Sequence, residues 1–263
     1  MGTKKITKLV LPFAGLGKRL LPLTERIPKA LVPLNKKPLL EYFLDEAISA
    51  GIKEVVLIIN PTHRKDFKSY LRLTGPKFPS LKFHIREQAT PGGNGHAIVQ
   101  AYDVVRGEPF VVRFCDDIVL GQPSVVESLI ELFGKYKSSI FLLERVPWNL
   151  VSRFGVVSVN RVSRRFYKVK KIVEKPKRSL APSNLTIVGG YVVTPSAMRN
   201  LKSVADTLPV IADDALPIAV AFQIELIIGG KVYGWEFPGK RLDCGTLEKL
   251  RRAEELLKKE RAL

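Results

Sequence analysis

The most informative part of this sequence is the stretch Leu9-Val10-Leu11-Pro12-Phe13-Ala14-Gly15-Leu16-Gly17-Lys18-Arg19. It passes from an apolar run, typical of a buried strand, into a glycine turn that two cations follow at once. Gly15 and Gly17 lack a Cβ, so the backbone can turn sharply there and point its N–H groups at an anion. Arg19 and the more distant Lys29 can then neutralise phosphate charge. The stretch therefore predicts a buried strand that ends in a polyphosphate-binding loop.

Two better-known phosphate loops do not fit these residues. A P-loop needs a second glycine at position 20, and a dinucleotide fingerprint needs its third glycine at the same position. Leu20 occupies that position in this chain. Gly15 and Gly17 alone would leave open a plain strand-to-loop turn in an unrelated α/β protein. The string Pro28-Lys29-Ala30-Leu31-Val32-Pro33 makes that alternative the weaker one.

The composition is that of an ordinary globular protein with a strongly basic charge. Of 263 residues, 46% are hydrophobic, and the net charge of +18 favours anionic partners such as nucleotides, phosphosugars or nucleic acid. Cys115 and Cys244 are not spaced as metal ligands, so we expect reduced thiols. Reduced thiols are typical of an intracellular protein, so we expect a cytoplasmic location. No apolar run reaches about 18 residues, which predicts no membrane span.

Apolar runs alternate with amphipathic helical patterns through the first half of the chain. This βαβα order predicts an α/β fold with a doubly wound, mostly parallel, Rossmann-like sheet. Ligands of such a sheet lie beyond the carboxyl ends of its strands. The expected strands are 6–11, 54–59, 81–85, 109–114 and 139–143, and the expected helices are 38–50, 63–71, 95–105 and 124–136.

The pattern changes after Val146 to short β-rich pieces separated by basic turns. These pieces are 155–159, 166–174 and 185–193, followed by a strand at 232–237 and a helix from Leu247. We therefore expect an α/β core over residues 1–145. Residues 146–263 are expected to form a β-rich subdomain and a C-terminal helix that share one core with it.

A second glycine-rich loop, Glu87-Gln88-Ala89-Thr90-Pro91-Gly92-Gly93-Asn94-Gly95-His96-Ala97, leads into a helix. Gly93 and Gly95 lie where the helix offers free N–H groups and a favourable dipole to an anion. Gln88 carries both a donor and an acceptor, as needed to read the edge of a base. His96 is expected to order the loop rather than to act as a base. The alternative is a flexible loop before a helix.

Two carboxylates follow apolar strands in distant parts of the chain. Asp116 comes directly after one strand, and Asp243 lies in an Asp-Cys-Gly turn after another. Together they can converge on one Mg²⁺, a hard cation that takes oxygen ligands and substrate phosphates. Lone aspartates at strand ends are otherwise turn formers or helix caps, and Asp117 is the weaker candidate ligand.

The string Val173-Glu174-Lys175-Pro176 pairs a carboxylate with an ammonium at a strand end. Adjacent strand residues face opposite ways, but the coming proline twists the end and lets both point at one ligand. The carboxylate can accept from sugar hydroxyls while the ammonium pairs with a phosphate. The alternative is an ordinary exposed charged pair.

Together these strings resemble the signatures of the sugar-1-phosphate nucleotidyltransferases, from Lys5 to about Ala253. Lys18 replaces the family's usual threonine, while Arg19, Pro22 and Lys29 fall in place. The strings Ala181-Pro182-Ser183-Asn184 and Gly189-Gly190-Tyr191 are similar to the uridylyltransferase branch in particular.

The resemblance implies a uridylyltransferase that makes UDP-glucose and pyrophosphate from UTP and glucose-1-phosphate. It implies a sugar-binding role for the β-rich part, Mg²⁺ as cofactor and a homodimer or homotetramer. It assigns catalysis to Arg19, Lys29 and Asp116, nucleotide binding to Ala14, Gly15, Gly17, Gln88, Gly93 and Gly95, sugar-phosphate binding to Glu174, Lys175, Gly155 and Gly189, and the metal to Asp116 and Asp243.

Three alternatives remain open at the level of sequence. A dTTP-dependent thymidylyltransferase differs in its base by one methyl, which alters affinity only modestly. The other two are a non-catalytic binder of nucleotide sugars and a basic nucleic-acid binder. No nucleic-acid module accompanies the basic stretches, which argues against the last. The resemblance is weakest over Asp206–Gly230, where the string at 209–215 keeps only the Asp-Ala end of the family pattern, and Ala30 also departs from that pattern, which bears on the sugar and the subunit contacts.

Overall fold

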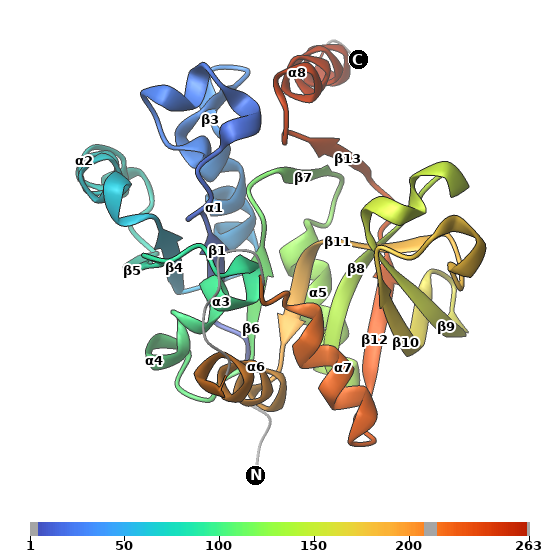
Figure 1. The fold of residues 1–263 in the computed structure, drawn as a ribbon. Helices are drawn as coiled ribbons and strands as arrows, with labels where there is room; N and C mark the ends of the chain where they lie inside the picture. Colours follow the sequence, from blue (N-terminus) through green and yellow to red (C-terminus); the bar gives the residue numbers. More distant parts are fainter. Residues whose placement is uncertain (1–4, 208–214, 262–263) are drawn as a thin grey trace.

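The computed structural model describes residues 5–207 and 215–261, and it is built around a nine-stranded sheet (Figure 1). The strand order is β5-β4-β1-β6-β11-β8-β12-β10-β9. Their bounds are β1 (Lys8–Pro12), β4 (Glu54–Ile59), β5 (Lys82–Glu87), β6 (Phe110–Arg113), β8 (Ser139–Arg145), β9 (Gly155–Ser163), β10 (Phe166–Glu174), β11 (Leu185–Val193) and β12 (Val232–Glu236).

Strands β5, β4, β1 and β6 are mutually parallel, as the alternating sequence pattern predicts. Val10 lies opposite Val56 on one side and Val112 on the other, so β1 is the middle of this half. Helices fill the crossovers, and their apolar faces cover the sheet. They are α1 (Leu39–Ser49), α2 (Arg64–Thr74), α3 (Gly93–Val99), α4 (Tyr102–Val105) and α5 (Val125–Tyr136). The expected helix over 95–105 is thus two shorter helices.

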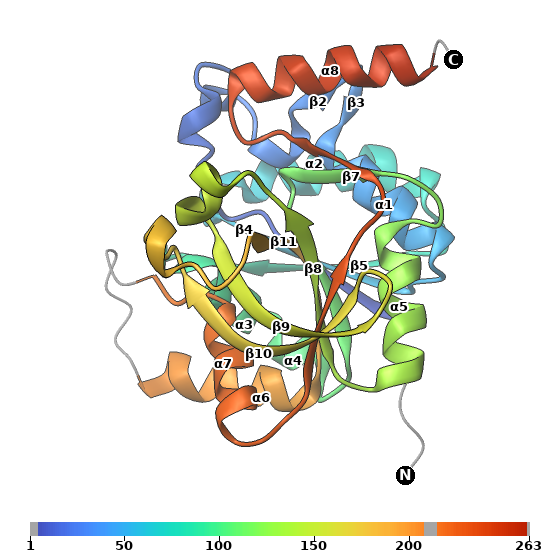
Figure 2. The same ribbon diagram turned by 90° about the vertical axis from the view of Figure 1, so that its right-hand side faces the viewer.

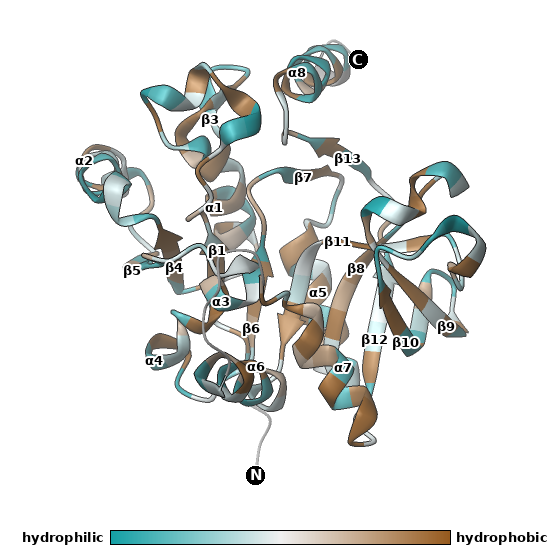
Figure 3. Cartoon of the chain, in the orientation of Figure 1, coloured by the Kyte–Doolittle hydropathy of each residue, from teal (hydrophilic) through white to brown (hydrophobic). Residues whose placement is uncertain are grey.

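The core has two halves, one on each face of the sheet. Leu9 and Leu11 belong to one core with buried residues of α1, α2, α5 and α8 (Leu247–Arg261), while Val10 belongs to the other with residues of α3, α4, α6 (Pro195–Thr207) and α7 (Ala219–Ile227). The alternation follows from the period of two along a strand. Figure 3 shows the hydrophobic residues concentrated in the central strands and on α7. The fold is therefore a three-layer, doubly wound α/β sandwich.

Strand β11 lies antiparallel between β6 and β8, so these two strands are not neighbours. Six of the nine residues from Leu185 to Val193 are hydrophobic, and eight of the nine are buried, so the strand needs cover on both faces and both edges. The registry with β8 shifts between Val188 and Tyr191, where Gly189 and Gly190 lie. The sheet is parallel in its first half and mixed beyond β6.

A small antiparallel ribbon, β7 (Asp117–Leu120) with β13 (Lys240–Asp243), has no counterpart among the elements expected from sequence. Helices α6 and α7 were likewise not expected. Figure 2 shows α8 lying above β13 and the β2–β3 hairpin (Pro33–Leu34 and Lys37–Pro38). Within the described residues, no helix has both the length and the apolarity to cross a bilayer. Of the string at 209–215, all but Ala215 lies outside the described residues.

Candidate active site

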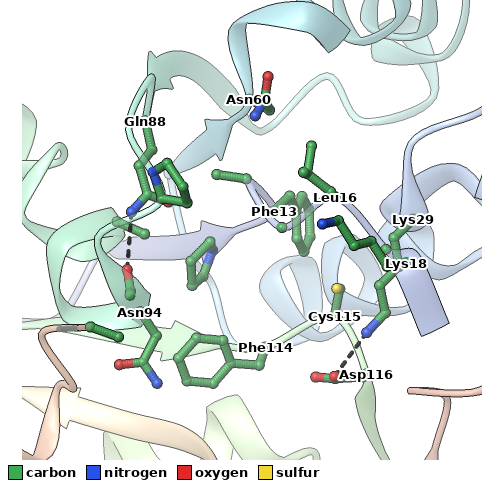
Figure 4. Close-up of a pocket in the computed structure, with 18 of the residues that line it drawn as sticks. Phe13, Leu16, Lys18, Lys29, Asn60, Gln88, Asn94, Phe114, Cys115 and Asp116 are labelled. Atoms are coloured by element: carbon green, nitrogen blue, oxygen red, sulfur yellow. Dashed lines mark hydrogen bonds and ion pairs between the residues drawn. The ribbon is translucent and has the colours of Figure 1, made fainter. Parts of the chain in front are cut away.

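A pocket of about 740 Å³ opens at the carboxyl ends of β1 and β6 (Figure 4). This is where an open α/β sheet is expected to bind its ligand. The lining includes residues from the glycine loop, from the second loop and from the segment after β6. Lys29 and Gly245 add to these three segments. The lining residues used below are Ala14, Gly15, Gly17, Lys18, Arg19, Lys29, Gln88, Gly93, Asn94, Phe114, Cys115, Asp116 and Gly245.

The glycine loop turns at Gly17 in a conformation that favours glycine and leaves no room for a side chain. Its φ of +65° lies in the left-handed region. A Cβ at Gly17 would lie 2.8 Å from the Thr24 Cγ2 atom. The Thr24 hydroxyl in turn donates to the Gly17 carbonyl at 2.9 Å. By contrast, a Cβ at Gly15 would meet nothing within 4 Å, so the backbone at that point is open to a ligand.

Lys29 and Asp116 form an ion pair on the floor of the pocket, with 2.8 Å between Nζ and Oδ2 (Figure 4). Burial alone would lower the pKa of Lys29, but the neighbouring acidic groups outweigh it and the pKa rises. Burial would likewise raise the pKa of Asp116, but the Lys29 ammonium holds it below its usual range. Both groups are therefore charged at neutral pH.

Asp116 and Asp243 lie on either side of Gly245. A Cβ built on Gly245 would be 3.0 Å from Asp243 Oδ1 and 3.6 Å from Asp116 Oδ2. The β7–β13 ribbon creates this proximity, because Asp243 pairs with Asp117 and the Cys244 N–H donates to the Asp116 carbonyl at 2.8 Å. Asp243 Oδ2 also accepts from Lys249 at 2.6 Å.

This arrangement offers two carboxylates to a cation rather than a complete ligand set. Among residues 5–207 and 215–261, no group of three or more His, Cys, Asp or Glu side chains could hold a metal. A divalent cation between Asp116 and Asp243 would complete its shell with water or with phosphate oxygens. Mg²⁺ is commonly bound in this way, by one or two carboxylates and a substrate.

Gln88 is 7% exposed and lies at the end of β5, on the opposite side of the pocket from Asp116. Its amide nitrogen donates to the Gly93 carbonyl at 3.0 Å and contacts His96 Nδ1 at 2.9 Å. Gly95, by contrast, does not line the pocket in this structure. Its N–H donates to the Leu216 carbonyl at 2.8 Å, and a Cβ there would collide with the same oxygen. The requirement for glycine at position 95 therefore comes from packing.

The four residues expected to bind the sugar phosphate lie beside the pocket rather than in its lining. Gly155 pairs with Glu174 across β9 and β10, and a Cβ at Gly155 would be 3.0 Å from Glu174 Oε2. Lys175 has a left-handed φ of +41°, and its Nζ lies 3.9 Å from Glu174 Oε1. The two side chains therefore do approach each other. Gly189 donates its N–H to Asp117 Oδ2 at 2.9 Å.

Tyr191 connects this edge to the pocket floor. Burial raises the pKa of its phenol, and the charges of Asp117, Glu174 and Asp116 raise it further. Its ring also meets Phe114 edge to face, with 5.7 Å between centroids. The negative charges of Glu174 and Asp116 thus both raise the pKa of the same buried phenol.

Sequence reasoning missed several residues that line the pocket. Asn60 directly follows β4 and lines the pocket, and its place at the end of a strand is the sequence signal that could have identified it. The Asn94 side chain accepts a hydrogen bond from the Ile218 N–H at 2.8 Å, which holds the chain around Ile218 against the second glycine-rich loop. Phe114 supplies an apolar wall. No sequence signal marks Asn94, because its partner is far along the chain.

Comparison with known proteins gives consistent matches over nearly the whole chain. The family model "Nucleotidyl transferase" matches residues 9–260. A UTP–glucose-1-phosphate uridylyltransferase of Bacillus subtilis (strain 168) is 34% identical over 260 residues, covering 92% of this chain and 87% of that protein. One of Staphylococcus haemolyticus (strain JCSC1435) is 31% identical over 261 residues, with coverages of 92% and 88%.

Solved structures lead to the same family. A UDP-glucose pyrophosphorylase complexed with UDP-glucose superposes with a TM-score of 0.85 at 29% identity, covering 97% of this chain and 99% of that chain. An apo UDP-glucose pyrophosphorylase gives 0.88 at 30% identity with the same coverage. With the glycine loop, the carboxylate pair and these matches in agreement, the chain belongs to the nucleotidyl transferase family.

Proposed function

We propose that this protein transfers the uridylyl group of UTP to glucose-1-phosphate, forming UDP-glucose and pyrophosphate. The observation that carries the proposal is the meeting of Asp116 and Asp243 around Gly245, at the pocket that the glycine loop borders. The names of the relatives in Bacillus subtilis and Staphylococcus haemolyticus support the choice of UTP and glucose-1-phosphate.

In the proposed reaction, an oxygen of the sugar phosphate attacks the α-phosphorus of UTP. The new O–P bond forms as the bond to the β-phosphate oxygen breaks, and pyrophosphate leaves with the electron pair. The attacking phosphate is already ionised at neutral pH, so no general base is needed. Catalysis is then alignment and charge neutralisation. Arg19 and Lys29, both in the pocket lining, are the cations placed to stabilise the leaving group.

Asp116 and Asp243 are the residues that would hold Mg²⁺. Their two carboxylates and the open positions between them fit a hard cation that takes its remaining ligands from phosphate and water. When bound, the metal would supply neutralisation of phosphate charge. Lys29 has a separate role here, because it keeps Asp116 ionised before any cation arrives.

The sugar phosphate is assigned to the edge formed by β9, β10 and β11. Glu174 offers a carboxylate to sugar hydroxyls, and Lys175 offers an ammonium to the phosphate. Their side chains are 45% and 66% exposed, so both are free to contact a ligand. Gly155 and Gly189 keep this surface clear of a Cβ at two points where one would strike Glu174 or Asp117. The homodimer or homotetramer and the cytoplasmic location stay predictions from the sequence.

The test is pyrophosphate release with glucose-1-phosphate and Mg²⁺, with UTP, dTTP, CTP, ATP and GTP in parallel. Release with UTP above all others is expected. Preference for dTTP would instead identify a thymidylyltransferase, and silence with every nucleotide and sugar phosphate would favour a non-catalytic binding protein. Asp116→Asn should be inactive while folded, whereas Asp45→Asn, on the exposed side of α1, should retain activity.

A further inference from the structure

The amide of Gln88 has only one orientation that satisfies its surroundings. The Gly93 carbonyl, 3.0 Å away, can only accept, so the group facing it must be the NH₂ and not the carbonyl oxygen (Figure 4). The same nitrogen lies 2.9 Å from His96 Nδ1. Both of its hydrogens are therefore directed at acceptors. The carbonyl oxygen Oε1 has no hydrogen-bond partner among the described residues, and Gln88 lines the nucleotide pocket.

The closer of two amide contacts to the His96 ring assigns its proton to Nε2. The amide nitrogen of Gln88 is a donor, so Nδ1 can be 2.9 Å from it only as an unprotonated acceptor. The ring is neutral in this arrangement. Burial lowers the pKa of His96, and the opposing contact with the Thr90 carbonyl does not offset it. On its other side, the Gln100 amide nitrogen donates to the His96 carbonyl at 3.1 Å and lies 3.3 Å from Nε2, so it competes for an unprotonated Nε2. A neutral ring can accept from only one of the two amides, and the shorter contact, to Gln88, assigns the acceptor to Nδ1.

We propose that His96 is a positioning residue for base selection: with the Gly93 carbonyl it turns the Gln88 amide so that Oε1 faces the nucleotide base. This inference rests on the proposed function, because it assumes that Gln88 reads a pyrimidine. An oxygen presented in this way accepts from the N3–H of uracil or thymine. Cytosine carries a lone pair at N3, so the same oxygen repels it. The pair thus selects bases that have an imino N–H.

The Gly93 carbonyl and His96 do not contribute in the same way. A reversed Gln88 amide would set two oxygens against each other at Gly93, which is always unfavourable. At His96 a reversed amide could be accommodated if the ring moved its proton to Nδ1. His96 therefore opposes reversal only while its Nδ1 stays unprotonated, whereas the Gly93 carbonyl opposes it in every state of the ring. A side chain without an acceptor at that place leaves Gly93 as the sole restraint.

Two substitutions at His96 separate the role of Nδ1 from that of bulk. His96→Asn places a carbonyl oxygen near the position of Nδ1 and should keep the restraint. His96→Leu fills similar space without an acceptor. We expect His96→Leu to raise the KM for UTP and to lower the UTP-over-CTP ratio of kcat/KM by about fivefold, the effect of one hydrogen bond. The KM for glucose-1-phosphate should not change, and His96→Asn should stay within about twofold of the original ratio.

Gln100→Ala is the matched control, because it removes the contact at Nε2 and leaves the one at Nδ1. Its UTP-over-CTP ratio should equal that of the unchanged protein. A second readout needs no turnover. Long-range ¹⁵N–¹H spectra report which ring nitrogen carries the proton, and the His96→Asn spectrum assigns the signal among the three histidines. We expect the Nε2–H tautomer.

The measurements distinguish a failure of the His96 positioning role from a failure of the proposed function. If the unchanged protein does not use UTP, the proposed function fails and the base reading fails with it. If UTP is used and His96→Leu keeps the original ratio, the positioning role is wrong while the proposed function stands. An Nδ1–H signal for His96 would also overturn the positioning role, whatever the kinetics.

Discussion

Asp117 and Arg241 form a buried ion pair, with 2.7 Å between Oδ1 and Nη1, that ties β7 to β13. The guanidinium also donates to Glu144 at 2.8 Å and lies 3.7 Å from Asp243 Oδ2. The other oxygen of Asp117 accepts from the Gly189 N–H. One arginine therefore connects the ribbon that places Asp243, the strand that ends in Glu144 and Arg145, and the glycines of β11.

Replacement of Arg241 with methionine should lower stability strongly. It would leave Asp117 and Glu144 without their cation at a site where Arg241 and Asp117 are only 11% and 16% exposed. Loss of one partner of such a buried pair costs about 3–5 kcal/mol. Urea unfolding measures the change. Lys202→Met, which removes an exposed pair with Asp206, should cost less than about 1 kcal/mol. Equal losses in the two variants would contradict the role given to Arg241.

Gly17→Ala should disturb the nucleotide loop beyond the ordinary cost of a left-handed residue. That cost is about 1–2 kcal/mol for alanine. The added methyl would also meet Thr24 Cγ2 at 2.8 Å. Gly107→Ala is the matched control, because Gly107 has φ +68° and nothing within 4 Å of its Cβ position. Gly17→Ala should therefore be the less stable variant and should have a raised KM for UTP. Identical unfolding curves would show that the Thr24 contact is relieved without cost.

The parts of the site predicted from sequence are those encoded locally. The β1 strand and its glycine loop follow from an apolar run ending in Gly15 and Gly17. The parallel order of β4, β1 and β6 follows from alternating patterns. Asp116 and Asp243 lie at strand ends, and both carboxylates come within 4 Å of the Cβ position of Gly245, while their role as metal ligands stays a prediction.

The features that sequence did not predict depend on distant contacts. β7 and β13 are four residues long and show no alternation of buried and exposed positions, so nothing local marks them as strands. α7 is apolar nearly all round and lacks the 3.6-residue period of a surface helix. The insertion of β11 between β6 and β8 joins residues far apart in the chain, and so does the contact of Gly95 with Leu216. Local periodicity carries no information about such pairings.

The Lys29–Asp116 pair should contribute to stability over a wide pH range. The pKa of Asp116 is lowered by folding, so its contribution is present above its unfolded pKa, near 3.9, and is lost as the pH falls through the folded value. The pKa of Lys29 is raised, so its contribution is present below about pH 10.4 and is lost only as the pH rises through the folded value. The stability difference between the protein and Lys29→Met should thus be level from about pH 5 to 9 and shrink below pH 4. A difference that varies steadily between pH 5 and 9 would show that the pair is not ionised as described.

Removal of metal gives a separate prediction for Asp243. EDTA should abolish turnover and added Mg²⁺ should restore it. Asp243→Asn should raise the Mg²⁺ concentration needed for half-maximal rate by at least about tenfold, since one of two carboxylates is lost. Lys249→Met, which removes the cation bonded to Asp243 Oδ2, should act in the opposite direction and lower it. The same Mg²⁺ dependence in both variants and in the unchanged protein would exclude Asp243 as a ligand.

The base selectivity should respond to pH through His96. Protonation puts a hydrogen on Nδ1, which then opposes the Gln88 NH₂ and favours the reversed amide. Burial lowers the pKa of His96, so the ring stays neutral at and above the ordinary histidine value of about 6.5. The ring also borders a hollow with Asp103, Lys202 and Asp206, where Asp103 pairs with Arg86 and Asp206 pairs with Lys202. Neither carboxylate is thus left unpaired to favour the imidazolium.

The UTP-over-CTP ratio of kcat/KM should therefore be level from about pH 8 to 6.5 and fall only at lower pH. Ionisation of the sugar phosphate does not affect this ratio, because the same sugar phosphate is the second substrate in both reactions. His96→Asn lacks a titrating ring, so its ratio should stay level over the whole range. A decline of equal size in His96→Asn would assign the pH dependence to another group, and a decline in the unchanged protein that begins above pH 7 would contradict the neutral, buried ring.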